Sequence, residues 1–209
     1  MEIKEVFVFG IGNYADPIIE LCLDCRYTIK GLYHFNSDRT GEMVNGYQIL
    51  GDYNDFYRDH KRANVVVAVG DNKIRFEKLK ELKCRGHNLI SLVHPTAYVS
   101  KSAVLGEAVY LHINSVVWSK SEIGDCTIIS PNALIGHHCK IGKACLISGS
   151  STIGCYVTIK DNTLVGIGST IISKEITIGQ NVTIGGQSLV TKDIPDNEVW
   201  AGVPAKKIH

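Results

Sequence analysis

The hydrophobic pattern of the second half of the chain repeats every six residues. From Val99 to Ile171 an aliphatic residue stands at every sixth position, and the spacing resumes from Ile178 to Val190 after one extra residue near Lys174. A small or β-branched residue follows four positions after almost every aliphatic one. A helix would show apolar spacings of three and four, so spacings of four and two predict short strands joined by turns, with two inward side chains per repeat.

Repeats of this kind predict a parallel β-helix. Three hexads form one triangular coil, and stacked coils bury a continuous core. A β-sandwich would instead show strict alternation with turns every eight to twelve residues, and the sequence shows neither. Cys139 and Cys145 fall at the inward fifth positions of their hexads. We therefore expect them to be core residues rather than nucleophiles.

The first part of the chain alternates between strand-like and helix-like segments. We predict strands at residues 6–9, 28–33, 64–69 and 89–93, helices at 15–26, 53–60 and 73–85, and a short edge strand or hairpin arm at 46–51. Such alternation is typical of a parallel sheet covered on both faces. His94-Pro95 marks the junction, which gives an α/β domain at residues 1–94 and the β-helix at 95–209.

Composition narrows the class of protein. The net charge is +1, so nothing indicates a nucleic acid or an anionic membrane as a partner. The seven cysteines are an odd number without dense spacing, which is typical of a reduced cytoplasmic protein. The N-terminal residues do not read as a signal peptide, and no run approaches the roughly 18 apolar residues of a membrane span.

A glycine-containing loop follows the first predicted strand, where doubly wound sheets bind phosphates. It contains Gly10, Gly12 and Asn13, and Gly70 and Asn72 follow a later strand at the same predicted sheet edge. A dinucleotide site would add a third glycine and an acidic residue after the second strand, where this chain has His34 and Phe35. The pattern favours a nucleotide with one ribose over NAD, and the structural alternative is that the glycines only form tight turns.

Two further groups of residues are candidates for chemistry. His137 and His138 take the third and fourth places of their hexad, which lie at an outward-facing turn. An imidazole suits general-base catalysis near neutral pH. The alternatives are two ordinary surface histidines, or a zinc site with His112 as a third ligand. Cys22 and Cys25 form C-x-x-C inside a predicted helix without a second pair, so we interpret them as helix packing.

Three motifs together carry a family resemblance. They are Ala68 to Arg75, which fits A-[IV]-G-x-N-x-x-R, the H-P-x-A-x-[IV] segment that begins at His94, and the G-V-P-A-K tail that begins at Gly202. With the hexads and one central histidine, the chain resembles the bacterial hexapeptide-repeat sugar acyltransferases. These include sialic acid O-acetyltransferases and the N-acetyltransferases of nucleotide-linked 4-amino sugars.

The resemblance implies an N-terminal Rossmann-like domain for the nucleotide sugar and a left-handed β-helix, an exception to the right-handed crossover rule. It also implies a cytoplasmic homotrimer that uses acetyl-CoA, needs no metal, and serves surface-glycan synthesis such as that of lipopolysaccharide or O-antigen. The family's catalytic residue falls on His137, with His138 beside it. The nucleotide-sugar residues fall on Gly10, Gly12, Asn13, Tyr14, His34, Phe35, Gly70, Asn72 and Arg75. The acetyl-CoA residues fall on Gly154, Gly166, Gly185, Gly202, Pro204, Ala205, Lys206 and Lys207.

The chain departs from the family pattern at several positions. His138 replaces an acidic residue, Ser130 replaces an asparagine, and Leu146 replaces a second histidine. Acidic residues after the second strand are replaced by His34, Phe35 and Asn36. These changes leave open what orients His137 and which base or sugar is bound.

The expected mechanism is direct attack of a sugar amine on the thioester of acetyl-CoA. His137 would accept the amine proton, and the backbone N–H near Gly154 would stabilise the oxyanion. The alternatives are an O-acetyltransferase acting on a sugar such as sialic acid, a non-catalytic protein that binds CoA and sugar nucleotide, and a zinc hydratase. The sequence does not distinguish between UDP, dTDP and GDP as the nucleotide carrier. It also does not distinguish an acetyl donor from a larger acyl donor.

Overall fold

The chain divides into two compact units at Leu92 and Val93. The computed structural model describes residues 4–209. The first unit contains strands β1 (Lys4–Phe9), β2 (Tyr27–His34), β3 (Met43–Val44), β4 (Tyr47–Asp52), β5 (Asn64–Val67) and β6 (Asn88–Leu89), and helices α1 (Ala15–Asp24), α2 (Tyr53–Asp59) and α3 (Asn72–Cys84), with a short 3-10 turn at Ser37–Arg39.

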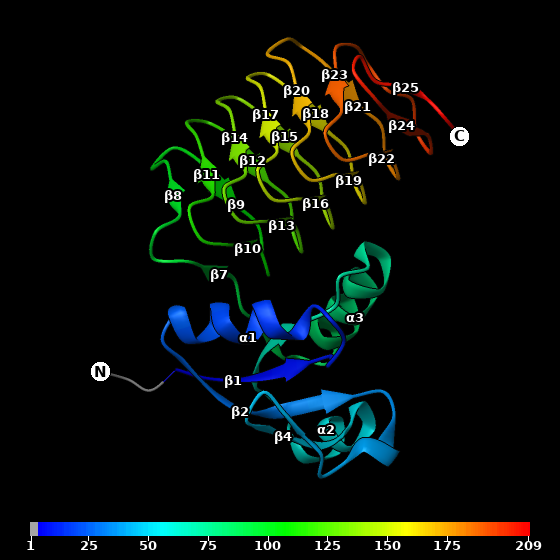
Figure 1. Cartoon of the computed structure of the whole chain (residues 1–209). Helices are drawn as coiled ribbons and strands as arrows, with labels where there is room; N and C mark the ends of the chain where they lie inside the picture. The colour runs from blue at the N-terminus through cyan, green and yellow to red at the C-terminus, as the bar shows by residue number, and fades with distance from the viewer. Residues whose placement is uncertain (1–3) are drawn as a thin grey trace. The chain divides into compact units, whose positions relative to one another are not determined.

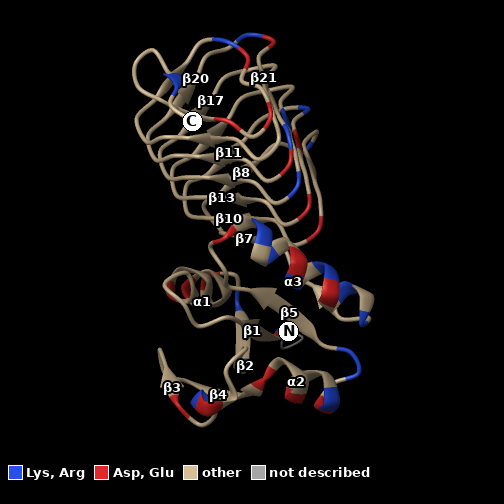
Figure 2. Ribbon diagram, turned by 90° about the vertical axis from the view of Figure 1, so that its right-hand side faces the viewer, with Lys and Arg blue, Asp and Glu red and all other residues tan. Residues whose placement is uncertain are grey.

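The strands of the first unit form one sheet in the order β3-β4-β2-β1-β5-β6. All neighbours are parallel except the β3–β4 hairpin. Helix α1 covers one face, and α2 and α3 cover the other (Figure 2). Right-handed crossovers require this division, because the chain leaves β1 in one direction and β5 in the opposite direction. The predicted alternation of strands and helices is confirmed.

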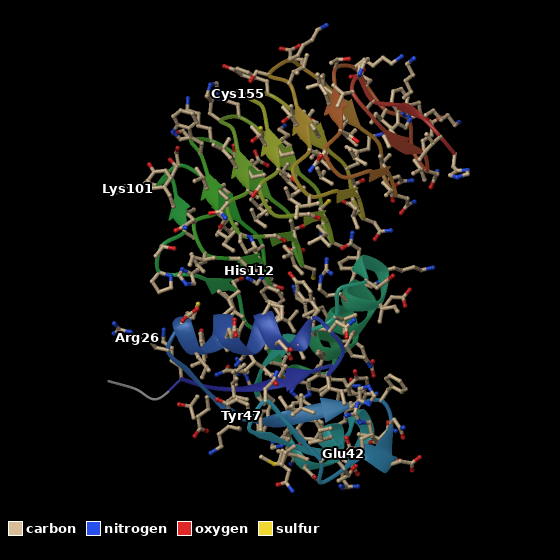
Figure 3. All side chains as sticks on the ribbon, in the orientation of Figure 1. Arg26, Glu42, Tyr47, Lys101, His112 and Cys155 are labelled. Atoms are coloured by element: carbon tan, nitrogen blue, oxygen red, sulfur yellow. The ribbon has the colours of Figure 1, made fainter. Side chains whose placement is uncertain are left out.

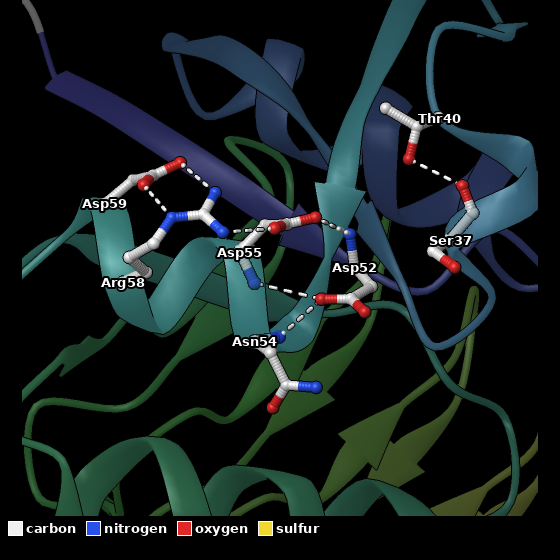
Figure 4. Close-up of polar contacts among 7 residues, drawn as sticks. All are labelled: Ser37, Thr40, Asp52, Asn54, Asp55, Arg58 and Asp59. Carbon is white, nitrogen blue, oxygen red and sulfur yellow. Dashed lines mark hydrogen bonds and ion pairs between the residues drawn. The ribbon is translucent and has the colours of Figure 1, made fainter.

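Helix α2 begins at a reciprocal capping box (Figure 4). The Asp52 carboxylate accepts N–H groups of Asn54 at 2.7 Å and Asp55 at 2.9 Å, and the Asp55 carboxylate accepts the Asp52 N–H at 3.0 Å. These bonds satisfy N–H groups that have no partner within the helix. Arg58 adds an ion pair to Asp55 at 2.8 Å. The box fixes the backbone on either side of Tyr53.

The second unit is a left-handed parallel β-helix, as predicted, with three sheets of very short strands (Figure 1). The first face holds β7 (Leu92–Val93), β10 (Tyr110–Leu111), β13 (Ile128–Ile129), β16 (Leu146–Ile147), β19 (Leu164–Val165), β22 (Thr183–Ile184), β24 (Val199–Ala201) and β25 (Lys206–Lys207). The second holds β8 (Tyr98–Val99), β11 (Val116–Val117), β14 (Leu134–Ile135), β17 (Thr152–Ile153), β20 (Thr170–Ile171) and β23 (Leu189–Val190). The third holds β9 (Val104–Leu105), β12 (Glu122–Ile123), β15 (Lys140–Ile141), β18 (Thr158–Ile159) and β21 (Thr177–Ile178).

The strand register measures the length of a coil. Leu134 pairs with Thr152, so one coil takes 152 − 134 = 18 residues. Thr158 pairs with Thr177, so the later coil takes 177 − 158 = 19 residues. The extra residue therefore lies where the hydrophobic spacing placed it. We call the turns that leave the first, second and third faces the first, second and third corners.

Turn residues at the fourth place of most hexads adopt a left-handed backbone, as at Asn132, His138 and Ala144 (φ +59°, +58° and +54°). Side chains at the fifth place point inward and cap the next coil. Ser121 Oγ donates to the Gly136 carbonyl at 2.6 Å, and Cys139 Sγ donates to the Gly154 carbonyl at 3.0 Å. Burial raises the pKa of Cys139 to about 11, so its thiol stays protonated. The predicted core role of this cysteine is confirmed.

The strand predicted at residues 89–93 is not one continuous strand in the structure. The run at residues 89–93 splits into β6, which joins the sheet of the first unit, and β7, which joins the first face of the β-helix. A continuous apolar run does not show that its first half belongs to one domain and its second half to the other. No helix among residues 4–209 combines the length and apolarity needed to cross a bilayer.

Candidate functional site

A cavity of about 700 Å³ opens at the carboxyl ends of β1, β2 and β5 in the first unit. This is the point where the chain order of the sheet reverses, the usual ligand position in such folds. The cavity is lined by Gly10, Ile11, Gly12, Asn13, Tyr14, His34, Phe35, Tyr53, Ala68, Val69, Gly70, Ile74 and Lys78. The structure therefore gathers most residues of the predicted nucleotide-sugar set around one space.

The loop after β1 requires glycine at residue 10, both for its backbone conformation and for lack of space. Gly10 has φ +104°, and a Cβ there would lie 2.8 Å from the Ala68 carbonyl oxygen. The Gly10 N–H donates to the Tyr33 carbonyl at 2.9 Å, so the loop passes tightly across the ends of both neighbouring strands. Helix α1 begins directly after this loop at Ala15. A helix N-terminus beside a cavity favours an anionic group.

Arg75 and Asn72 lie outside the cavity lining, in contrast to their predicted binding role. Arg75 is fully buried and donates to the carbonyls of Val69 and Gly70, each at 3.1 Å, and to Asn72 Oδ1 at 2.8 Å. A guanidinium held in this way fixes the Gly70 loop from behind. Its contribution to binding is therefore indirect, through the loop conformation.

Tyr53, Ile74 and Lys78 also line the cavity, although no sequence motif predicted them. Lys78 Nζ lies 4.1 Å from the centre of the Tyr53 ring and 2.6 Å from Glu81 Oε2. Tyr53 stacks on Phe9 with ring centres 5.0 Å apart, and burial raises its pKa to about 12. Lys78 is the one charged side chain among the described lining residues. Ile74 and Lys78 share one face of α3 at helical spacing, but the sequence does not show which face meets the cavity.

The end of β2 presents two aromatic rings to the same cavity. The His34 and Phe35 rings lie 4.1 Å apart, and Phe35 is 74% exposed. Burial, and then the charge of Arg39, lower the pKa of His34, which favours a neutral imidazole. Two neutral rings beside an anion-attracting loop fit a ligand with one flat ring and one phosphate-bearing end.

His137 and His138 lie at the second corner, between β14 and β15, as predicted. Their Nδ1 atoms are 3.0 Å apart. Tyr156, one coil later, stacks on His138 at 4.9 Å and 18° and stands at 90° to His137 at 5.2 Å. Trp118 approaches His137 from the previous coil at 5.9 Å. The sequence could have indicated Tyr156, because it follows His138 by 18 residues, the length of one coil, and therefore lies next to it in the stack.

The oxyanion donor that we expect near Gly154 is not the N–H of Gly154 itself. The Gly154 N–H already donates to the Ile171 carbonyl at 2.8 Å within the coil stack. A Cβ at Gly154 would lie 2.3 Å from the Ser173 nitrogen, so coil stacking alone requires glycine there. The Gly154 N–H is therefore not available to an oxyanion, and that role needs another donor.

The other predicted acetyl-CoA residues lie away from the histidine corner of the same chain. Gly166, Gly185 and Gly202 follow first-face strands and stand at the first corner. Stacking also explains two of these glycines, since a Cβ at Gly166 would meet the Gly186 nitrogen at 2.5 Å and one at Gly185 would meet Ala201 Cβ at 2.8 Å.

The C-terminal tail folds back as a hairpin in which β25 pairs with β24. Lys207 Nζ is engaged by Glu198 Oε1 at 2.7 Å, and this contact holds the pKa of Glu198 below its usual value. Lys206 is exposed and forms no ion pair among the described residues. Pro204 is exposed and Ala205 is buried. Of the two predicted phosphate contacts, Lys206 is therefore the better placed.

His112 lies near the start of the β-helix (Figure 3), directly after β10 at the first corner, whereas the histidine pair stands at the second corner. It is 6% exposed, and burial together with His94 lowers its pKa to about 4. Within residues 4–209, no cluster of three or more His, Cys, Asp or Glu side chains is arranged to hold a metal ion.

Two families match parts of the chain. Residues 5–82 match the PglD N-terminal domain, and residues 89–177 match the GMPPB C-terminal domain. The chain spans less than a quarter of the curated relatives that it matches. These include galactoside O-acetyltransferase of Escherichia coli (strain K12), 54% identical over 46 residues, which are 22% of this chain and 23% of that protein. UDP-N-acetylbacillosamine N-acetyltransferase of Bacillus subtilis (strain 168) is 41% identical over 46 residues, 22% of this chain and 21% of that protein.

Solved structures match over the full length. A mutant of perosamine N-acetyltransferase from Caulobacter crescentus, in complex with CoA and GDP-perosamine, is 30% identical with a TM-score of 0.93, covering 100% of this chain and 98% of that one. The acetyltransferase domain of PglB from Neisseria gonorrhoeae, in complex with acetyl coenzyme A, is 28% identical with a TM-score of 0.90, covering 99% and 100%. The chain therefore belongs to the hexapeptide-repeat sugar acyltransferases, the family that its motifs resemble.

Proposed function

We propose that the protein transfers the acetyl group of acetyl-CoA to the amine of a nucleotide-linked 4-amino-4,6-dideoxy sugar. The observation that carries the proposal is the half-buried His137 at a turn of the β-helix, in a chain that aligns end to end with a perosamine N-acetyltransferase. The cavity of the first unit supplies a site for the nucleotide, with an anion-attracting loop at Gly10 to Asn13 and aromatic rings at His34 and Phe35.

The reaction needs one base and no covalent intermediate on the protein. The sugar amine attacks the thioester carbonyl, and His137 Nε2 accepts the proton that the nitrogen loses. Collapse of the tetrahedral intermediate forms the amide and releases CoA as the thiolate, which then takes up a proton. General-base catalysis of this kind contributes about 10²–10⁴ in rate. The exposure of Lys206 supports a contact between its ammonium group and a phosphate of the cofactor.

We propose that the working unit is a homotrimer. Within one chain, the predicted acetyl-CoA residues stand at the first corner and His137 stands at the second. A single cofactor that uses both sets would have to lie between two copies. The seven cysteines, an odd number without dense spacing, fit a reducing compartment, which supports a cytoplasmic enzyme that supplies surface-glycan synthesis.

A second candidate is O-acetylation of a sugar hydroxyl. The similarity to galactoside O-acetyltransferase of Escherichia coli favours it, although that match covers only 22% of this chain. Amine and hydroxyl acceptors need the same base, so the structure of the base does not decide between them.

The test is a thiol-release assay with acetyl-CoA and 4-amino-4,6-dideoxy sugars on UDP, dTDP and GDP. Sialic acid and galactosides serve as hydroxyl acceptors, and His137→Ala serves as the matched control. We expect rapid release with one amino sugar, lost in the variant. Release only with a hydroxyl acceptor would replace N-acetylation by O-acetylation. Binding of acetyl-CoA without release on any acceptor would favour a non-catalytic binding protein.

A further inference from the structure

The contact between the two adjacent histidines restricts where their protons lie. The Nδ1 atoms of His137 and His138 are 3.0 Å apart, a hydrogen-bond distance. At this distance two lone pairs repel each other, and two N–H groups collide. One proton therefore lies between the two nitrogens, and the neutral pair has two arrangements. In one of them Nε2 of His137 is the free base, and in the other Nε2 of His138 is the free base.

Aromatic rings from the neighbouring coils fix the orientation of both imidazoles. Tyr156 lies almost flat against His138, at 4.9 Å and 18°, and perpendicular to His137, at 5.2 Å and 90°. Trp118 closes the other side of His137 at 5.9 Å and 67°. His138 and Tyr156 both have left-handed backbones, φ +58° and +62°, so their side chains leave equivalent points of consecutive coils.

We propose that His138 Nδ1 accepts the Nδ1 proton of His137, and that the Tyr156 ring holds His138 in the orientation that this bond requires. The inference rests on the proposed function for its catalytic consequence. His137 is the catalytic base, while His138 and Tyr156 are positioning residues. The bond keeps Nε2 of His137 free to accept the substrate proton. When it does so, the imidazolium still donates from Nδ1 to His138, and that bond becomes charge-assisted.

Within residues 4–209, the turns directly before and after this one in the stack carry no carboxylate, and the nearest acidic residue along these strands is Glu122, which pairs in register with Lys140. The previous coil contributes Ser119 and Lys120, and the next coil contributes Cys155 and Tyr156. Lys140 follows on β15, and the buried Cys139 thiol lies 3.8 Å from the His137 carbonyl. A histidine at residue 138 therefore stands where the family resemblance implies an acidic residue. We expect a carboxylate introduced at this position to strengthen the base.

The fold supplies well-matched control variants. Ala108 and Ala144 occupy the same place in their hexads as His138, with φ +52° and +54°. Alanine at residue 138 therefore fits the turn, and loss of activity in His138→Ala would not come from misfolding. Tyr156→Phe retains the stacked ring and removes only the hydroxyl.

The first experiment is ¹⁵N NMR of the full-length protein labelled at histidine, without substrate, with His137→Gln used to assign the signals. We expect His137 to carry its proton on Nδ1 in the wild type. In His138→Ala it should move to Nε2, the commoner tautomer of an unrestrained imidazole. A wild-type His137 protonated at Nε2 would overturn the proposal and assign the free base to His138.

The second experiment is the pH dependence of kcat and KM with acetyl-CoA and the active acceptor. His138→Ala should lower kcat by about tenfold or more with little change in KM, because the base is then mostly in the wrong tautomer. His138→Glu should restore kcat and move the acid limb of the profile upward by about one pH unit. Tyr156→Ala should also lower kcat, because the ring that packs on His138 is lost. Tyr156→Phe should keep near wild-type kcat, because the ring remains.

The two readouts separate this inference from the proposed function. Unchanged kcat and an unchanged pH profile in His138→Ala would overturn the positioning role, even if N-acetylation is established. The expected tautomers without turnover on any acceptor would instead overturn the proposed function and leave the proton arrangement standing.

Discussion

The second and third corners of the β-helix share one backbone but carry different chemistry. At the third corner, Asp125 accepts the Glu107 N–H at 3.0 Å and Asp161 accepts the Lys143 N–H at 2.8 Å, each from the previous coil. Asn162 and Asn181 continue an amide ladder at 2.8 Å. Acidic and basic residues both lie along this edge, as with Lys143 and Asp125 at 3.1 Å (Figure 2).

The equivalent turns of the second corner hold His137, His138 and Tyr156. The two histidines bond to each other, the Tyr156 ring packs against both, and Tyr156 and Trp118 are 50% and 48% exposed. Serines cap the backbone at other turns of the second corner, where Ser102 Oγ accepts the Lys120 N–H and Ser173 Oγ accepts the Cys155 N–H, each at 3.1 Å. The turn that holds His137 and His138 instead leaves its side chains available to a ligand. Corner residues with no capping role are therefore where function is best sought on this fold, and each comparison below tests that division.

The largest expected effect is on catalysis at the second corner. His137→Ala should lower turnover by about 10²–10⁴, because the base is removed. The free energy of unfolding should stay within about 0.5 kcal/mol of wild type, since the side chain lies at an outward turn. Steady-state thiol release and urea unfolding measure the two quantities. A variant that keeps near wild-type turnover would remove His137 from the mechanism.

The next effect is on coil stacking. Gly154→Ala would place a Cβ 2.3 Å from the backbone nitrogen of Ser173, which cannot move without separating two coils. We expect a loss of about 1–3 kcal/mol in the free energy of unfolding, measured by urea denaturation. Gly12→Ala is the control, because a Cβ there meets no heavy atom within 4 Å. Equal stability of the two variants would contradict the stacking explanation.

A pH effect of similar size is expected near the start of the β-helix. His112 has its pKa lowered to about 4 by burial, whereas an unfolded histidine titrates near about 6.5. As the pH falls through this window, the unfolded chain binds a proton that the folded chain does not. The free energy of unfolding should therefore decrease on acidification, with His112 contributing on the order of 2 kcal/mol between pH 6.5 and 4. Urea unfolding at several pH values should show a shallower dependence in His112→Leu, and an equally steep one would refute this assignment.

The smallest effect concerns the capping ladder of the third corner. Asp161→Ala should lower stability by about 1 kcal/mol, because the Lys143 N–H loses its carboxylate acceptor. Turnover should not change, and this outcome is the reverse of that for His137→Ala. Asp161→Asn retains an acceptor oxygen and should recover most of the loss. Reduced turnover in Asp161→Ala at full stability would mean that the two corners are not functionally distinct.

The sequence by itself determined most of the fold. A six-residue spacing admits one arrangement of inward side chains, so it predicted the coils, the extra residue near Lys174 and the outward position of His137. The glycine loop after β1 was predicted equally well, because a short buried strand followed by Gly10 and Gly12 leaves few conformations. Local periodicity was sufficient in both cases, since each element packs against neighbours with the same repeat.

Only the tertiary structure decided which groups are already engaged. Arg75 matched a binding motif but is buried behind its loop, and the Gly154 N–H matched a catalytic expectation but is bonded to Ile171. Tyr53 and Lys78 line the cavity, but the sequence does not show which side of their helices faces it. A hydrogen bond or a packed ring depends on atoms distant in sequence. Motifs therefore located the sites, and three-dimensional contacts decided which atoms in them remain free to react.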